Sequence, residues 1–211
     1  MNALLIVANK EFRDGLRNRW VLAITVVFAL LAVGLAYFGA SASGVVGFTS
    51  LATTIVSLAS LAIFLIPLIA LLLAYDTIVG EEEQGTLLLL LTYPLGKVQL
   101  LAGKFLGHAA ILAVSTTAGF GIAAILIGIL SGNVGDAELW RAFAFFILTS
   151  VLLGWVFVAI AYVASVVASE KSRAAGVALL VWFWFVLVFD LLLLGGLVAS
   201  KGTHGGDWLP Y

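Results

Sequence analysis

A stretch of 56 residues, 20–75, contains no Asp, Glu, Lys or Arg. A helix needs about 20 apolar residues to cross the hydrocarbon core of a bilayer, so this stretch is too long for one membrane span and long enough for two. The small-residue segment 39–44 divides it, because clusters of Gly and Ser favour turns. We therefore expect an all-α membrane protein whose first two spans cover 20–38 and 50–75.

The composition supports this class and excludes others. Hydrophobic residues make up 64% of the chain and charged residues 10%, against roughly 45–50% and 25% in soluble domains. The net charge of −1 offers no basic surface for nucleic acid. The chain has no cysteine, one methionine (Met1) and two histidines, so thiolate and other soft-metal ligands are nearly absent. We expect no cofactor and no resident metal.

Three further apolar segments, 105–130, 142–168 and 174–199, bring the predicted number of spans to five. Eight of the ten Lys and Arg residues fall on one side if 1–19 is cytoplasmic, which predicts a cytoplasmic N-terminus. Segment 200–211 is then periplasmic, and we expect a sixth span beyond Tyr211. Residues 40–42 loosely resemble a signal-peptide cleavage site, but the apolar stretch before them is too long, so we expect no cleavage.

Residues 1–19 are predicted to form an amphipathic helix in the cytoplasmic headgroup layer. At about 100° per residue, one face is apolar and the opposite face is largely basic. The apolar face consists of Leu4, Leu5, Ala8, Phe12 and Leu16, and the opposite face of Lys10, Arg13, Asp14 and Arg17. The alternative is a cytoplasmic extension of the first span.

Segment 76–104 carries the densest charge in the chain. Glu81, Glu82 and Glu83 stand where the first turn of a helix favours negative charge. The leucines at 87–91 are too few to cross a bilayer, and Pro94 is expected to end this helix. A second short helix is predicted from about residue 95 into the span at 105. A solvated charged loop is the alternative, but the adjacent leucines favour a docking element.

Other polar residues give weaker signals. Gly103-Lys104 fails as a phosphate loop because position 98 is Val and position 105 is Phe, so any ATP chemistry belongs to another chain. Asp190 is the one acid within a predicted span, and His108 lies one turn inside another. Both are candidates for intramembrane function, although a structural role is expected for each.

Twelve residues between 76 and 105 resemble the signature of the ABC-2 type permeases, the membrane subunits of ATP-binding-cassette (ABC) transporters. They are Asp76, Gly80, Glu81, Gly85, Thr86, Leu87, Leu90, Leu91, Pro94, Gly103, Lys104 and Phe105. Further stretches resemble the members of this family that support maturation of nitrous oxide reductase. These stretches are 14–20, 47–50, 67–76, 85–96, 153–157, 170–172 and 188–190.

The resemblance implies a six-span fold in the cell inner membrane, with an interfacial N-terminal helix and cytoplasmic coupling helices within 76–104. The chain itself would not be an enzyme, because a separate NosF-like ATPase would hydrolyse ATP. Its other partners would be a NosD-like periplasmic protein and a second permease copy in the bilayer. Its role would be to couple ATP hydrolysis to the transport or conformational change needed for assembly of the copper centre. The residues expected to couple to the ATPase are Glu81, Glu82, Glu83, Gly85, Thr86 and Leu87, with Glu170, Lys171 and Arg173 as a minor contact.

Two other functions are weighed against this one. The first is an ABC-2 exporter of a lipid, drug or ion, which shares the fold and differs in cargo. The second is an intramembrane enzyme using Asp190 or His108, which is disfavoured because such enzymes need two or more polar groups facing one another in the bilayer.

Overall fold

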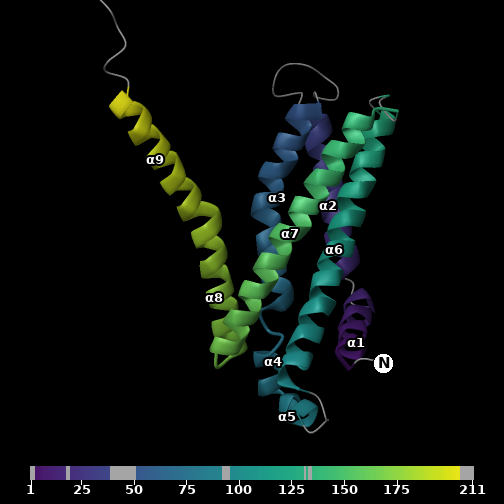
Figure 1. Ribbon diagram of the computed structural model, residues 1–211, viewed down its shortest axis with the longest axis vertical. Coiled ribbons are helices and arrows are strands. Elements are labelled where there is room, and N and C mark those ends of the chain that lie inside the picture. Colours follow the sequence, from purple (N-terminus) through teal and green to yellow (C-terminus); the bar gives the residue numbers. More distant parts are fainter. Residues whose placement is uncertain are drawn as a thin grey trace, which may run out of the picture.

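The structure is a computed structural model of the 211-residue chain, and it describes residues 3–17, 20–38, 51–91, 96–130, 132 and 135–204. Regular structure in these ranges is entirely helical, which confirms the predicted all-α class (Figure 1). The elements are α1 (Ala3–Arg17), α2 (Trp20–Phe38), α3 (Leu51–Ala74), α4 (Val79–Glu83), α5 (Thr86–Leu91), α6 (Lys97–Leu130), α7 (Ala137–Val167), α8 (Lys171–Phe183), the π-helical segment η2 (Trp184–Val188) and α9 (Phe189–His204).

Within the described residues, four helical segments are long and apolar enough to cross a membrane. They are Thr54–Glu83, Lys97–Leu130, Ala137–Val167 and Lys171–Ala199. Helix α2 has 19 residues, about 28 Å of helix, and its part Ala23–Gly34 forms a shorter apolar helix. Four of the five expected spans therefore have a matching helical segment, and the span at 20–38 remains a prediction.

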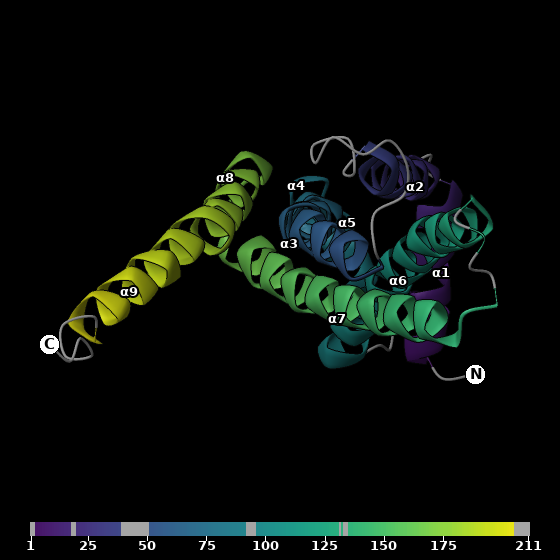
Figure 2. The same ribbon diagram turned by 90° about the horizontal axis from the view of Figure 1, so that it is seen from above.

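Helix α6 organises the bundle. It packs along α1, α2 and α7, while α3 packs mainly along α7. Helix α8 contacts α3 and α7, and Trp182 near its end still donates to the Phe64 carbonyl oxygen in α3 at 2.9 Å. Helix α9 extends away from the other helices (Figures 1 and 2). The segments predicted to be cytoplasmic, namely α1, α4, α5 and the α7–α8 turn, lie at the same end of the molecule (Figure 1).

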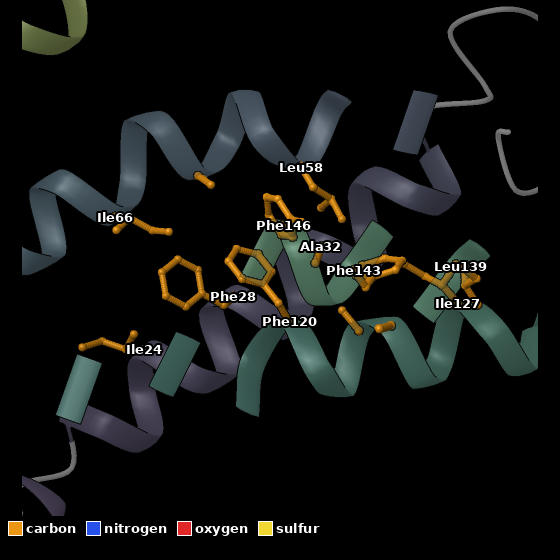
Figure 3. Close-up of a cluster of buried hydrophobic side chains, with 13 residues drawn as sticks. Ile24, Phe28, Ala32, Leu58, Ile66, Phe120, Ile127, Leu139, Phe143 and Phe146 are labelled. Atoms are coloured by element: carbon orange, nitrogen blue, oxygen red, sulfur yellow. The ribbon is translucent and has the colours of Figure 1, made fainter. Parts of the chain in front are cut away.

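Aromatic side chains fill the core between α2, α3, α6 and α7 (Figure 3). The rings of Phe28 and Phe120 stack with centroids 4.8 Å apart, and Phe146 meets Phe120 edge-on at 4.7 Å. Such pairs add to the stabilisation that burial of the rings provides. A second apolar cluster, nearer the α7–α8 turn, joins α3, α6, α7 and α8 through residues such as Leu71, Leu112 and Val158.

Three glycines let other helices approach the backbone of α6. A Cβ on Gly119 would lie 2.9 Å from the carbonyl oxygen of Thr25 in α2. A Cβ on Gly103 would lie 2.9 Å from the carbonyl oxygen of Leu4, and one on Gly107 3.1 Å from that of Ala8. Small residues permit such contact between membrane helices. Helices α1 and α2 therefore pack along α6 in succession.

The helix expected to run from the glutamates through the leucines is divided in two. Helix α4 ends at Glu83, and α5 begins at Thr86. Gly85 between them has φ +69°, the left-handed conformation that glycine adopts without a Cβ penalty. Its N–H donates to the Glu82 carbonyl oxygen at 3.0 Å and closes the turn. Pro94 lies outside the described residues, and the second short helix is continuous with the following span in α6.

Candidate functional site

Lys104 is buried at the junction of three helices. Its side chain is 3% exposed, and Nζ lies 2.6 Å from Glu81 Oε1 in α4 and 3.0 Å from Glu11 Oε1 in α1. A buried ammonium is costly unless it is paired and hydrogen-bonded, and two carboxylates meet that need here. We refer to Glu11, Lys104 and Glu81 as the charge triad. It joins α1, α6 and α4 at the end of the molecule predicted to be cytoplasmic.

Ser165 holds the start of α4. Its Oγ accepts hydrogen bonds from the backbone N–H groups of Ile78 at 3.0 Å and Val79 at 3.1 Å. The first N–H groups of a helix have no partner within the helix, so a hydroxyl from α7 supplies the acceptor. The five-residue helix is thus fixed to α7 at its first turn and to α6 through Glu81.

Helix α4 also contacts the beginning of α8. The Glu83 carboxylate accepts from the backbone N–H of Lys171 at 2.7 Å, a charge-assisted hydrogen bond at a helix N-terminus. The Lys171 ammonium in turn pairs with Asp76 at 3.2 Å. The two predicted cytoplasmic loops, 76–104 and 169–173, are therefore bonded directly to each other.

His108 lies one turn beyond the triad on α6. Its Nδ1 is 2.8 Å from the Tyr162 hydroxyl in α7 and 3.1 Å from the carbonyl oxygen of Lys104. The two rings meet edge-on at 5.9 Å. His108 therefore connects α6 to α7 directly above the buried lysine.

Electrostatics favour the ionised form of Glu11. Burial alone would raise the pKa of Glu11, but the charge and hydrogen bond of Lys104, together with Lys10, outweigh it, and the pKa lies below its ordinary value. Lys10 loses some solvation, yet Glu11 and Asp14 raise its pKa above the ordinary value. Glu11 is therefore a carboxylate at neutral pH.

A cavity of about 490 Å³ lies beside the triad, between α1, α2, α3 and α6. Its polar lining consists of Glu11, Asp14, Asp76 and His108, together with the Tyr75 side chain, and its remaining walls are largely aliphatic. In the part of the chain that the structure describes, no three His, Cys, Asp or Glu side chains are grouped so that they could hold a metal ion.

Comparison with known proteins shows the family. Residues 5–205 match the sequence profile described as "ABC-2 family transporter protein". The chain is 60% identical to the "Probable ABC transporter permease protein NosY" of Stutzerimonas stutzeri over all 211 residues, which cover 76% of that relative. It is 61% identical to the protein of the same name in Pseudomonas aeruginosa, again over all 211 residues and 77% of the relative.

This chain belongs to the ABC-2 transporter family. It is a NosY-like ABC transporter permease, as the sequence resemblance indicated. The residues in 76–105 that carry the resemblance include Glu81 and Lys104, which the structure brings within hydrogen-bonding distance.

The predicted coupling residues of this ABC-2 permease occupy different environments. Of the three adjacent glutamates, Glu81 points to Lys104 and Glu83 to the start of α8, whereas the Glu82 side chain is exposed and pairs with no group among the described residues. Thr86 Oγ1 donates to the Glu81 carbonyl oxygen at 3.2 Å, which joins α5 to α4. Leu87 beside it is half-buried.

The remaining candidates lie further apart. In the second loop, Glu170 accepts from the Ser172 hydroxyl at 3.4 Å, and the Arg173 guanidinium donates to Ser169 Oγ at 3.2 Å. Asp190 is exposed on α9, the helix that extends from the bundle, whereas His108 faces Tyr162. The structure therefore does not bring Asp190 and His108 together.

The sequence did not predict the roles of Glu11 and Ser165. At about 100° per residue, Glu11 falls at the edge of the predicted apolar stripe, about 20° beyond Leu4, and an acid beside an apolar face can have a buried partner. Leu5 and Leu16, assigned to that stripe, are 57% and 46% exposed. The face of α1 that meets α6 therefore differs from the predicted one. Nothing in the local sequence distinguishes Ser165 from other serines of apolar helices.

Proposed function

We propose that this permease is the inner-membrane subunit that couples ATP hydrolysis by a separate, NosF-like ATPase to the assembly of the copper centre of nitrous oxide reductase. The work done across the membrane is transport or a conformational change passed to a NosD-like periplasmic protein. Two permease copies form the membrane part, each with a cytoplasmic N-terminus and a sixth span. The 60% identity to NosY over the whole chain is the observation that carries this proposal.

The contact with the ATPase includes Glu82 in α4, Leu88 in α5 and Val98 at the start of α6. Leu88 and Val98 are 73% and 80% exposed, and the exposed Glu82 carboxylate is free of partners among the described residues. Large apolar side chains exposed at the same end of the molecule as an exposed charge are typical of a docking region. The complementary surface of the ATPase would present an apolar groove with a basic residue at its edge.

Charge reversal at single glutamates tests this contact. We expect Glu82→Lys to reduce co-purification of the ATPase with the full-length permease, because it places a cation against a basic residue. Glu138→Lys is the matched control, since Glu138 is exposed in the first turn of α7, at the opposite end of the bundle. Unchanged recovery of the ATPase with Glu82→Lys would remove the proposed contact. Reversal of Glu81 or Glu83 does not answer this question, since both bond within the permease.

We further propose that copper is held by the partners of this permease. The chain has no cysteine and no methionine beyond Met1, and Cu(I) prefers such soft ligands. The expected result is that the purified permease alone binds no stoichiometric copper when it is titrated with Cu(I) and analysed by metal content. Stoichiometric binding would contradict the proposal.

The second candidate is an ABC-2 exporter of another substrate, such as a lipid, drug or ion. The family supports it equally, because the profile match fixes the fold of the transporter and not its cargo. Deletion of the gene separates the two functions. Copper-free nitrous oxide reductase in the deletion strain supports maturation, whereas a fully loaded enzyme supports export of another substrate.

A further inference from the structure

Lys104 is paired with two carboxylates from different helices, and docking of the ATPase does not by itself require such pairing. Among the residues that the structure describes, Lys104 is the one charged residue that is buried. Its two partners come from helices on either side of α6, Glu81 from α4 and Glu11 from α1 (Figure 1). One ammonium is therefore shared between the proposed docking element and the N-terminal helix.

A shared ammonium makes the positions of the two carboxylates interdependent. Each carboxylate is attracted to Lys104 and repelled by the other, and the triad carries one uncompensated negative charge. At low dielectric these terms change steeply with distance. Withdrawal of Glu81 would leave Lys104 to Glu11 alone and draw α1 closer, and approach of Glu81 would have the opposite effect.

The rest of the structure makes the triad a suitable connection. Helix α4 is short and is bonded through Ser165 and Lys171, two residues at the α7–α8 end. Helix α1 packs on α6 at Gly103 and Gly107, on both sides of Lys104 in the sequence. Among the described residues the buried Glu81 Oε2 atom has no hydrogen-bond partner, so the arrangement satisfies only part of this carboxylate, which is unfavourable for a buried group.

We propose that Lys104 is a positioning residue that transmits a displacement of α4 to the N-terminal helix α1 through the Glu81–Lys104–Glu11 triad. This inference rests on the proposed function, because it requires the ATPase to move α4. The coupling is reciprocal, so a change in the position of α1 also changes the energy of α4. Helix α1 is then a moving part of the permease and not only an anchor at the bilayer surface.

The test measures a distance in the complex of full-length permease and ATPase in nanodiscs. The chain contains no cysteine, so Asn9→Cys on α1 and Val163→Cys on α7, both at exposed positions, can carry spin labels. The distance is measured without nucleotide and after trapping with ATP and vanadate. In the otherwise unsubstituted protein we expect trapping to shift it.

Glu11→Gln and Lys104→Met should abolish this shift while the ATPase still co-purifies. With Glu11→Gln the nucleotide-free distance should stay unchanged, because the glycine contacts keep α1 on α6. Lys104→Arg should retain the shift, since it keeps a cation between the carboxylates. Lys10→Met is the matched control, because Lys10 contacts the same Glu11 from the surface with its side chain 61% exposed, and it should also retain the shift.

The proposal is overturned if trapping causes no shift in the unsubstituted complex. It is also overturned if Glu11→Gln shows the full shift. If Glu11→Gln alters the nucleotide-free distance and keeps a normal shift, Glu11 has a structural role alone, which overturns the proposal as well. Glu11→Gln decides the question if Lys104→Met does not fold, since it preserves the Lys104–Glu81 pair. Failure of the proposed docking contact is a separate result: the ATPase would then still co-purify with the Glu82→Lys permease.

Discussion

Lys104 carries its charge where solvent does not reach, and its stability depends on two carboxylates from distant parts of the chain. Removal of one partner from a buried ion pair costs about 3–5 kcal/mol, because the other charge stays buried without compensation. Lys104→Met should destabilise the permease by about that amount. Lys10→Met should cost about 0–1 kcal/mol, as expected for a surface ion pair. Chemical unfolding in mixed micelles measures both, and equal effects would contradict a special role for burial.

The stabilising effect of Glu11 should depend on pH. Its folded-state pKa lies below the ordinary value of 4.5, so its contribution is complete above pH 4.5 and is lost as the pH falls through the lowered pKa. Glu11→Gln should therefore be less stable than the unsubstituted protein at neutral pH, and the difference should shrink in acid. The measurement is the unfolding free energy of both proteins from about pH 7 to about pH 3. A difference that stays constant with pH would refute the assignment.

Residue roles were the part least accessible from the sequence. Glu81, Glu82 and Glu83 are chemically identical neighbours, yet one is paired with Lys104, one is exposed, and one bonds to the α8 N-terminus. The rotation of about 100° per residue separates them, but their partners lie up to 88 residues away. Local pattern carries no information on such contacts, so only the cluster as a whole could be predicted.

At the scale of helices, the close approach of α1 to α6 yields a matched pair of variants. Gly107→Ala places a methyl group 3.1 Å from the Ala8 carbonyl oxygen, and the backbone of α1 must move to admit it. We expect a loss of about 1–3 kcal/mol. Gly121→Ala in the same helix meets no atom of the described residues within 4 Å and should change stability by about 0.5 kcal/mol or less. Thermal unfolding of the two variants side by side tests this, and equal losses would be inconsistent with the packing described.

The long apolar helices were predictable, whereas the division of the glutamate–leucine segment into two short helices was not. The apolar runs predicted α3, α6, α7 and the α8–α9 segment, because hydrophobicity over about 20 residues is a strong signal. The division between α4 and α5 depends on the left-handed conformation of Gly85. A glycine after an acidic turn is a recognised helix-ending signal, but the leucines that follow it favoured one continuous helix.

For the molecule as a whole, the proposed orientation can be tested by labelling. The absence of cysteine allows single cysteines at Gln84, before α5, and Gly135, before α7, both of which are exposed. We expect a membrane-impermeant maleimide to modify Gly135→Cys in cells with a permeable outer membrane, and Gln84→Cys only after the inner membrane is opened. The reverse pattern would invert the topology and remove the proposed ATPase contact.

The sequence identified the family and the all-α fold, whereas the arrangement of helices came from the structure. Charge distribution predicted that α1, α4, α5 and the α7–α8 turn share one side, and Figure 1 places them at one end of the bundle. Which helices pack together could not be predicted, because apolar surfaces of similar composition match many partners. The sequence likewise did not predict that α9 extends away from the other helices (Figure 2).

The bond between Glu83 and the first N–H of α8 has a mechanical consequence. Helices α8 and α9, with the π-helical segment between them, run from Lys171 to His204, about 50 Å of continuous helix at about 1.5 Å per residue. This rod is bonded to α4 at its base and contacts α3 and α7 as far as Trp182 and Phe185, while its far end stands clear of the bundle (Figure 1). If the rod moves rigidly, a tilt of about 5° at the base would displace the far end by about 4 Å, which is most of one helical turn.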